Sequence, residues 1–331
     1  MQFHRGSPFA LSSAGTEPRS RRGGRTGQSG VGARLLAGFH DSIGKCRPRP
    51  ARGPYQDATP RARFDAPAST VLPCLPVLTG PAESRRAVLG VIPARYGASR
   101  FPGKPLAVLW GKPMLQHVWD RARAAQGIDE LVVATDDERI ALAARGWGAT
   151  VEMTSPACAS GTDRVAEVAR RRASALIILN LQGDEPELET GAVTQLVATM
   201  RADDTIAMGT VAHKEPDLAA MASENVVKVV LDDNGFALYF SRADLAGASR
   251  GGPALRHAGV YAFRRGLLMA FASWPPGKLE LAERLEQLRA VERGVRIKVV
   301  LGERPFAGVD TPEQMAVLER RGPPPVGVGG A

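Results

Sequence analysis

Three cations lie close together in the loop that follows the first apolar run after the basic N-terminal stretch. The apolar run is 88–92, and the cations are Arg95, Arg100 and Lys104. Arginine can bind phosphate oxygens through two parallel N–H groups, and lysine supplies a compact point charge. A stiff cationic loop at the end of a buried strand predicts a polyphosphate site, although a solvated basic loop would contain the same residues.

Carboxylates follow a later apolar run, and another precedes a helix start. Asp184 and Glu185 come just after residues 176–181, and Asp310 stands before a predicted helix. A carboxylate beside bound phosphates is a common Mg²⁺ ligand. Because ligands bind outside the carboxyl ends of parallel strands, we expect Asp184 to face the cationic loop. Helix capping is the alternative for Glu185 and Asp310, and on the residues alone it is the stronger one for Asp310.

A scattered set of polar side chains lies farther along the chain. His257 and Tyr261 are four residues apart, so on a strand they share one face. Glu286 and Gln287 interrupt a leucine-rich helical pattern. On the residues alone, an ordinary half-exposed strand and a solvated helix face are the stronger explanations. The set is Arg242, Arg256, His257, Tyr261, Glu286 and Gln287.

These side chains need a scaffold, and the pattern from residue 87 to about 320 supplies one. Short apolar runs such as 88–92, 131–134 and 176–181 predict buried strands, and 114–122 and 161–172 show helical spacing. A chain that alternates strand and helix in this way predicts an α/β fold. We expect an open, mostly parallel, Rossmann-like sheet with flanking helices.

The pattern changes after about residue 225. Residues 226–231 and 236–240 flank the sequence Asp-Asp-Asn-Gly, a strong hairpin signal because Asn-Gly favours positive φ. Residues 255–263 predict a further strand, and 279–293 predict one helix with leucines on one stripe. We therefore expect an antiparallel portion inserted into the α/β domain.

The net charge of +9 comes from one part of the chain. Residues 1–86 carry 14 basic and 5 acidic side chains, whereas the remaining 245 residues carry 29 of each. The domain at 87–320 therefore has no general attraction for nucleic acid or an anionic membrane, and we expect neither as a partner. The composition of 1–86 predicts a disordered basic extension, either a dispensable one or an organelle transit peptide. A disordered tail is predicted at 321–331.

Two familiar nucleotide motifs are missing from the sequence. The first strand is followed by neither G-x-G-x-x-G nor G-x-x-x-x-G-K-[ST], which argues against a nicotinamide dehydrogenase and a P-loop NTPase. Cys46, Cys74 and Cys158 have no metal or redox spacing, as suits a reducing cytoplasmic compartment. No apolar run reaches the roughly 18 residues that a membrane span needs.

Seven stretches together resemble a known family. From about residue 87 to 320, in order, the chain is similar to the 3-deoxy-manno-octulosonate cytidylyltransferases, also called CMP-Kdo synthetases. The first stretch alone would indicate only the nucleotidyltransferase superfamily, whereas the later ones are more specific. The stretches are IPARYGASRFPGKPL, SGTDRVAEV, NLQGDEP, NVVKVVLDDNGFALYFSRA, RHAGVYAF, ERLEQLR and GVDTPEQM.

The resemblance implies a role for individual residues. The CTP phosphates would be bound by Arg95, Arg100 and Lys104. The nucleotide would also lie near Ser160, Gly161, Thr162 and Gln182. The Mg²⁺ ligands would be Asp184 and Asp310, which reverses the capping interpretation of the latter. The sugar pocket would be lined by Arg242, His257, Tyr261, Glu286 and Gln287. The catalytic groups would be Arg95, Lys104, Asp184 and Asp310.

The resemblance also implies a fold and a reaction. The fold would be that of nucleotide-diphospho-sugar transferases, with the antiparallel portion serving dimerisation of a homodimer. CTP and 3-deoxy-D-manno-octulosonate (Kdo) would give CMP-Kdo and pyrophosphate for lipopolysaccharide synthesis. An amino-Kdo or sialic acid nucleotidyltransferase is the nearest alternative. An inactive nucleotide-binding module is the alternative from another class.

Overall fold

The computed structural model describes residues 87–97, 101–306 and 308–324. All of them belong to one unit of the chain, residues 74–331. Our predictions for 1–86, for Arg100 and for most of the C-terminal tail lie outside the described residues.

Four parallel strands form the half of the sheet that follows from the apolar runs. In spatial order β6, β1, β4 and β5 pair side by side. Val88 and Ile92 of β1 pack on one face of the sheet and Leu89 and Val91 on the other, so the strand is buried on both faces. The strands are β1 (Val88–Ala94), β4 (Glu130–Thr135), β5 (Thr150–Met153) and β6 (Ile177–Asn180).

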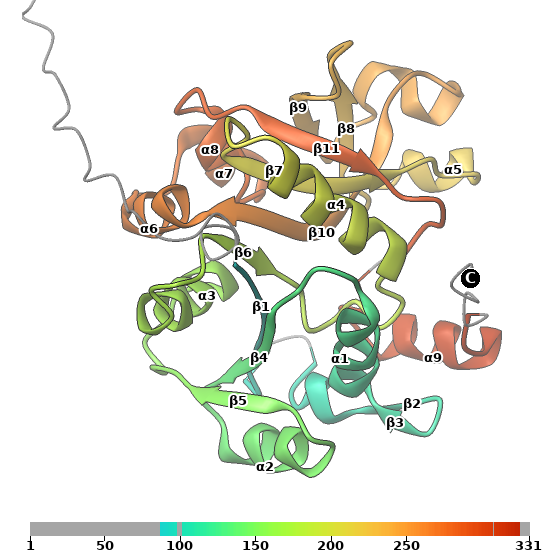
Figure 1. Ribbon diagram of the computed structural model, residues 1–331. Coiled ribbons are helices and arrows are strands. Elements are labelled where there is room, and N and C mark those ends of the chain that lie inside the picture. The colour runs from blue at the N-terminus through green and yellow to red at the C-terminus, as the bar shows by residue number, and fades with distance from the viewer. Residues whose placement is uncertain (1–86, 98–100, 307, 325–331) are drawn as a thin grey trace, which may run out of the picture. The chain divides into compact units, whose positions relative to one another are not determined.

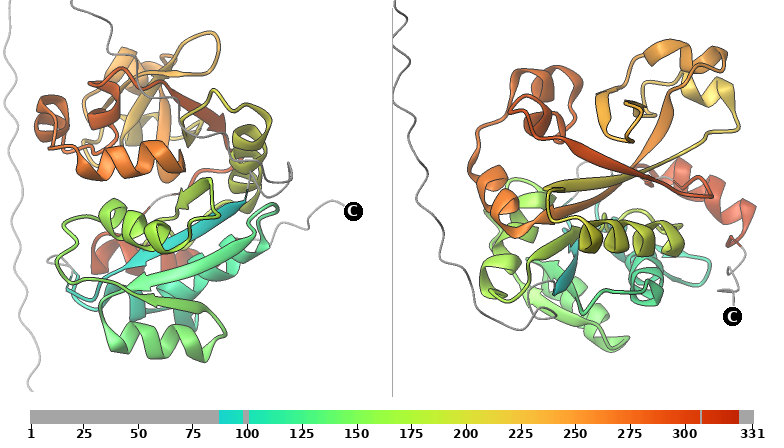
Figure 2. Two further views of the ribbon diagram at one scale, coloured as in Figure 1. Left: turned by 60° about the vertical axis from the view of Figure 1, so that its left-hand side comes forward. Right: turned by 45° about the horizontal axis from the view of Figure 1, so that its top comes forward.

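The other half of the sheet is mixed, as the hairpin signal predicts. β10 is antiparallel to both β6 and β7, β11 is parallel to β7, and β8 pairs with β10 and β9. Figure 2 shows the β8–β9 hairpin projecting away from β1, β4 and β5. The strands are β7 (Met208–His213), β8 (Lys228–Leu231), β9 (Ala237–Ser241), β10 (Leu255–Arg264) and β11 (Ile297–Leu301).

Helices cover both faces of the sheet (Figure 1). Apolar residues of α1, α2 and α4 pack in the core on one face, and those of α3, α6 and α8 pack on the other. The prediction of an α/β sheet with flanking helices is confirmed. The longer helices are α1 (Met114–Ala124), α2 (Glu138–Gly146), α3 (Gly161–Arg171), α4 (Thr190–Ala202) and α6 (Arg265–Ser273).

One predicted helix is interrupted. Instead of a continuous helix over 279–293, the chain forms α7 (Lys278–Glu283) and α8 (Leu288–Val291). Arg284 between them has φ 56° and ψ 45°, in the left-handed region that ends helices. The break turns Gln287 toward the hydroxyl of Tyr261, which donates to Gln287 Oε1 at 3.1 Å. Tertiary packing thus overrides the leucine spacing on which the prediction depended.

The last helix returns the chain to the first loop. Helix α9 (Pro312–Arg321) begins with Thr311 as N-cap and is held to the short hairpin of β2 (Val108–Leu109) and β3 (Lys112–Pro113). The indole of Trp110 donates to the Leu318 carbonyl at 3.1 Å. Helix α5 (Leu218–Met221) completes the α-helices of the described residues, and no helix in this part of the chain could cross a membrane.

Candidate active site

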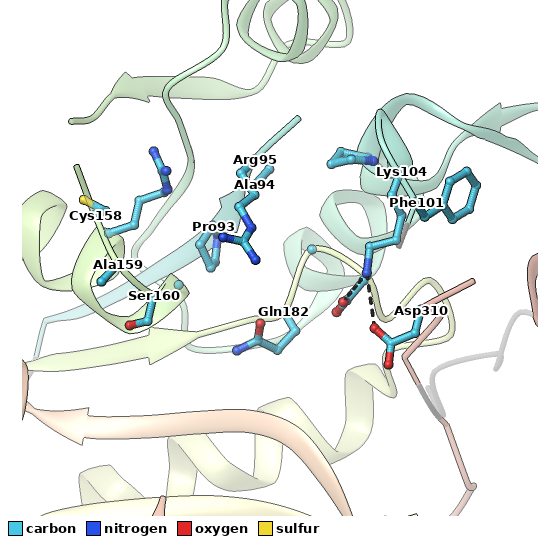
Figure 3. Close-up of a pocket in the computed structure, with 15 residues that line it drawn as sticks. Pro93, Ala94, Arg95, Phe101, Lys104, Cys158, Ala159, Ser160, Gln182 and Asp310 are labelled. Atoms are coloured by element: carbon cyan, nitrogen blue, oxygen red, sulfur yellow. Dashed lines mark hydrogen bonds and ion pairs between the residues drawn. The ribbon is translucent and has the colours of Figure 1, made fainter. Parts of the chain in front are cut away.

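The order in which successive strands join the sheet reverses at β1, and the first cavity lies at this switch point. β4 and β5 lie on one side of β1 and β6 lies on the other. In open α/β sheets, ligands bind outside the carboxyl ends of strands at such a point. A cavity of about 410 Å³ opens there, lined by residues that include Arg95, Lys104, Ser160, Gly161, Gln182, Asp184 and Asp310 (Figure 3).

Lysine and two carboxylates form the centre of this cavity. Lys104 Nζ donates to Asp184 Oδ2 at 2.6 Å and to the Val309 carbonyl at 2.9 Å, and it lies 3.6 Å from Asp310 Oδ1. Figure 3 shows the ammonium group reaching down from its loop toward Asp310. The structure therefore brings together three of the predicted catalytic side chains, which come from three distant parts of the sequence.

Local backbone structure sets the positions of Lys104 and Asp310. Gly103 has φ 74°, and a Cβ there would come 3.1 Å from the ring of Tyr96, so a glycine suits this turn before Lys104. Asp310 does not cap helix α9, because Thr311 accepts the N–H of Gln314. The capping interpretation of Asp310 is therefore wrong. Its carboxylate lies near Lys104 instead.

The carboxylate pair has the chemistry of a Mg²⁺ site. Asp184 and Asp310 offer hard oxygen ligands, and a cationic group, the ammonium of Lys104, already lies within 4 Å of both. The described residues contain no cluster of three His, Cys, Asp or Glu side chains suited to a metal. Two carboxylates suit Mg²⁺, which usually takes its other ligands from water and substrate phosphates.

The N-terminus of α3 forms another wall of the first cavity. Ser160 caps the helix by accepting the N–H of Asp163, so its hydroxyl is already engaged. Gly161 lines the cavity and Thr162 is buried behind it. The unpaired N–H groups of a first helical turn attract anions. Arg95 is exposed and points into the same space (Figure 3).

Arg164 is a lining residue that sequence reasoning missed. Its side chain is buried and pairs with Asp136 at 3.1 Å between Nη2 and Oδ2. Nη1 also donates to the hydroxyl of Thr154. A signal was present, because Arg164 lies four residues before the buried Val168, so the two share one face of the helix. Arg164 thus lines the first cavity with a buried guanidinium group whose charge Asp136 offsets.

The second cavity, of about 620 Å³, adjoins the first. It is lined by four of the five predicted sugar-pocket residues, namely Arg242, His257, Tyr261 and Gln287. The guanidinium of Arg242 donates to the carbonyls of Glu224 and Glu283 at 3.0 and 3.1 Å. Among the ion pairs of the described residues, none joins Arg242 to a carboxylate. Its charge is therefore available for an anionic ligand.

Lys228 holds the backbone around Arg242. The side chain is fully buried, and its ammonium donates to the carbonyls of Ser223, Val226 and Arg242 at 2.9, 2.8 and 2.5 Å. Burial lowers the pKa of this lysine, and three carbonyl oxygens satisfy its three donors. Lys228 thereby fixes one side of the second cavity without entering it.

Glu286 does not line the second cavity. Its Oε2 accepts the hydroxyl of Thr162 at 2.5 Å, next to the first cavity. Burial raises the pKa of this carboxyl. It instead lines a third hollow together with Ser160 and Arg289. Sugar binding by Glu286 remains a prediction from the resemblance.

Two histidines near the second cavity are held neutral. Desolvation lowers the pKa of His257 to about 3 and that of His213 to about 4. The hydroxyl of Thr210 donates to the Val260 carbonyl at 2.7 Å, so it accepts from Nε2 of His257 at 2.9 Å. Neutral His257 consequently keeps Nδ1 as an acceptor.

We expect these histidines to make the protein less stable in mild acid. In the unfolded chain both titrate near pH 6.5, whereas in the folded chain they stay neutral to about pH 4 or below. The unfolded state therefore binds more protons below pH 6.5, and the free energy of unfolding falls as pH decreases. Each histidine contributes a slope of up to about 1.4 kcal/mol per pH unit.

His213→Phe isolates one contribution, because His213 lies outside both cavities and its ring stacks on Phe306 at 5.9 Å. Urea unfolding at pH 7, 6 and 5 should give a shallower pH slope for the variant than for the wild type. Identical slopes would contradict the prediction.

Comparisons with known proteins agree with this geometry. The sequence model of the cytidylyltransferase family matches residues 89–297. A 3-deoxy-manno-octulosonate cytidylyltransferase of Geobacter sulfurreducens is 48% identical, over 70% of this chain and 98% of its own length. One of Anaeromyxobacter sp. is 50% identical, over 70% of this chain and 94% of its own length. A CMP:2-keto-3-deoxy-manno-octonic acid synthetase solved with CTP is 39% identical, with a TM-score of 0.65, and covers 71% of this chain and 98% of that one.

The switch-point cavity, the side-chain cations and the paired carboxylates define a nucleotidyltransferase of the α/β class. Its fold is that of the cytidylyltransferases. The chain belongs to the family of 3-deoxy-manno-octulosonate cytidylyltransferases.

Proposed function

We propose that this protein transfers the cytidylyl group of CTP to the anomeric hydroxyl of Kdo and releases pyrophosphate. The product, CMP-Kdo, would supply lipopolysaccharide synthesis. One observation carries the proposal: Gln182, Asp184 and Asp310 line both cavities, so a ligand in each would meet at the carboxylates. Relatives named for this activity align over nearly their whole length.

CTP fits the first cavity by charge. Arg95 and Lys104 offer cations to a triphosphate, and the N-terminus of α3 adds N–H groups. Arg164 also lines this cavity, with its charge offset by Asp136. The position proposed for Arg100, one of the three phosphate ligands, lies outside the described residues.

The second cavity suits Kdo because charged and hydrogen-bonding side chains line it. The free cation of Arg242 suits the sugar carboxylate. Nδ1 of His257 can accept from a hydroxyl. Nε2 of Gln287 is buried without a partner in the described residues and can donate to one. A polar pocket of this kind discriminates strongly between hydroxylated ligands.

The reaction needs positioning and charge neutralisation rather than a covalent intermediate. The two cavities hold the attacking hydroxyl and the α-phosphorus on either side of Asp184 and Asp310. Lys104 and Arg95 stabilise charge on the α-phosphate and the departing pyrophosphate. We propose Mg²⁺ as cofactor, held by Asp184 and Asp310; when bound it lowers the pKa of the sugar hydroxyl and offsets the phosphate charge.

Pyrophosphate release from CTP tests the proposal. The wild-type protein with Mg²⁺ should release pyrophosphate with Kdo and form CMP-Kdo. Equal or faster release with amino-Kdo or sialic acid would move the assignment to a related nucleotidyltransferase. CTP binding by calorimetry without turnover of any of the three sugars would indicate an inactive nucleotide-binding module.

We also propose a homodimer that works in the cytoplasm. The antiparallel side exposes leucines, with Leu238 of β9 exposed by 60% and Leu281 of α7 by 67%. Exposed apolar side chains of this kind suit an interface between copies. Cys158 is a free thiol, as suits a reducing compartment. Sedimentation analysis should give the mass of a dimer, and Leu238→Arg should shift it toward monomer.

Removal of residues 1–80 is expected to leave kcat and both KM values unchanged. The family match begins at residue 89, and the relatives align almost completely without needing the basic segment. Pyrophosphate release by the truncated and the full chain checks this expectation. A truncated protein with the melting temperature of the full chain but without activity would show that the segment takes part in catalysis.

A further inference from the structure

Glu185 is a buried carboxylate on the wall of the second cavity. It follows Asp184 in the turn after β6 and is 5% exposed. Its Oε1 accepts the N–H of Gly259 at 2.9 Å. Its Oε2 is buried and has no hydrogen-bond partner in the described part of the chain. The carboxylate does not cap a helix, since α4 begins only at Thr190.

β10 is shaped to seat this carboxylate. The pairing of β10 with β7 shifts register between Ala258 and Tyr261, which releases the N–H of Gly259 toward Glu185. A Cβ at position 259 would come 2.8 Å from Glu185 Oε1, so only glycine permits this approach. One oxygen is therefore fixed by the fold, and the other is left without a hydrogen-bond partner among the described residues.

The cavity wall offers a complementary group. Gln287 is 3% exposed, its Oε1 accepts from Tyr261, and its Nε2 has no partner among the described residues. A buried polar atom without a partner is costly and calls for a ligand that satisfies it. An acceptor on one residue and a donor on another suit a polyhydroxylated ligand.

We propose that Oε2 of Glu185 hydrogen-bonds a hydroxyl group of the sugar acceptor and that Glu185 determines specificity for it. The inference rests on the proposed function. A site that binds a substrate hydroxyl rejects an analogue without it, because the buried group is then left unpaired. Glu185 thus acts in binding the sugar, beside the carboxylate pair rather than as part of it.

Glu185→Gln tests the inference, because its amide oxygen can keep the contact with Gly259 while an NH2 group replaces Oε2. We expect KM for Kdo to rise at least about 10-fold, with KM for CTP and kcat nearly unchanged, as for the loss of one buried hydrogen bond. The Mg²⁺ concentration for half-maximal rate should not change. A shift in that concentration, or a fall in kcat alone, would overturn the role in sugar binding.

Glu189→Gln is the matched control. Glu189 is also 5% exposed, but it lies outside both cavities and accepts the N–H groups of Glu303 and Arg304. Its variant should melt at a lower temperature and keep the wild-type KM for Kdo. An equal rise of KM in both variants would mean a merely structural effect and overturn the inference. If Glu185→Gln does not fold, Glu185→Asp withdraws the same oxygen. It should likewise raise KM for Kdo and leave kcat and KM for CTP nearly unchanged.

Kdo analogues that each lack one hydroxyl identify the partner. The wild type should lose kcat/KM at least about 10-fold for one analogue, and Glu185→Gln should not distinguish that analogue from Kdo. Additive losses for every analogue would overturn the contact. Absence of pyrophosphate release by the wild type with Kdo would instead overturn the proposed function, and the inference with it.

Discussion

Replacement of Asp184 by asparagine is expected to lower kcat for CMP-Kdo formation by at least about 100-fold, the scale seen when one preorganised charge-stabilising group is removed. The carboxylate lies where the two cavities meet, 2.6 Å from the ammonium of Lys104. Asparagine keeps the shape but removes the charge that suits a divalent cation. Asp310→Asn should act in the same direction, since Asp310 lines both cavities as well.

Pyrophosphate release measured against Mg²⁺ concentration checks this prediction, and calorimetry should show that CTP still binds to the variants. Asp120→Asn is the control, because Asp120 pairs with Lys112 at 2.7 Å on the surface and lines neither cavity. It should behave as the wild type. Turnover by Asp184→Asn close to the wild-type rate would remove Asp184 from the proposed metal site.

Lys104→Met is expected to lower kcat/KM for CTP by at least about 100-fold, because a cation that stabilises the α-phosphate and the leaving group is lost. Methionine approximates the length of the side chain without its charge. A second consequence concerns the free protein. There the ammonium offsets part of the negative charge of Asp184 and Asp310, at 2.6 and 3.6 Å. Without it the two carboxylates should bind Mn²⁺ more tightly in the absence of CTP, because no internal cation competes.

Steady-state kinetics and Mn²⁺ titration followed by electron paramagnetic resonance measure the two effects. Lys112→Met, in the surface pair with Asp120, is the matched control and should change neither. Unchanged kcat/KM in Lys104→Met would contradict the phosphate role. Weaker Mn²⁺ binding would contradict the competition between the ammonium and the metal.

The sequence predicted those helices and strands that are determined by residues close together in the chain. Strand β1 and helices α1, α3 and α9 lie close to their predicted positions, because apolar spacing and capping residues act over a few neighbours. Ser160 forms a capping box with Asp163 at the start of α3. Helix α4 and strand β7 were not assigned, although the apolar residues Val193, Leu196, Val197 and Met200 of α4 recur at helical spacing.

Non-local features could not be predicted in this way. The leucine stripe over 279–293 indicated one helix, but packing of Gln287 on Tyr261 accompanies a break at Arg284. The partners of Lys228 and Glu185 are backbone groups on other segments, at Arg242 and Gly259, and no sequence spacing indicates them. Such contacts depend on sheet register, which is set by the whole core.

The sequence by itself determined the residue types, their order and their place at strand ends, and through its motifs the family. Only the tertiary structure decided which of them share a cavity. Lys104 and Asp184 stand 80 residues apart, yet sheet pairing of β1 with β6 and the return of α9 bring both beside Asp310. Electrostatic and hydrogen-bonding interactions act over a few ångströms, so these side chains form a site only after folding has brought them that close. For the same reason, the local sequence indicated that Asp310 caps a helix, whereas in the fold it lies beside Lys104.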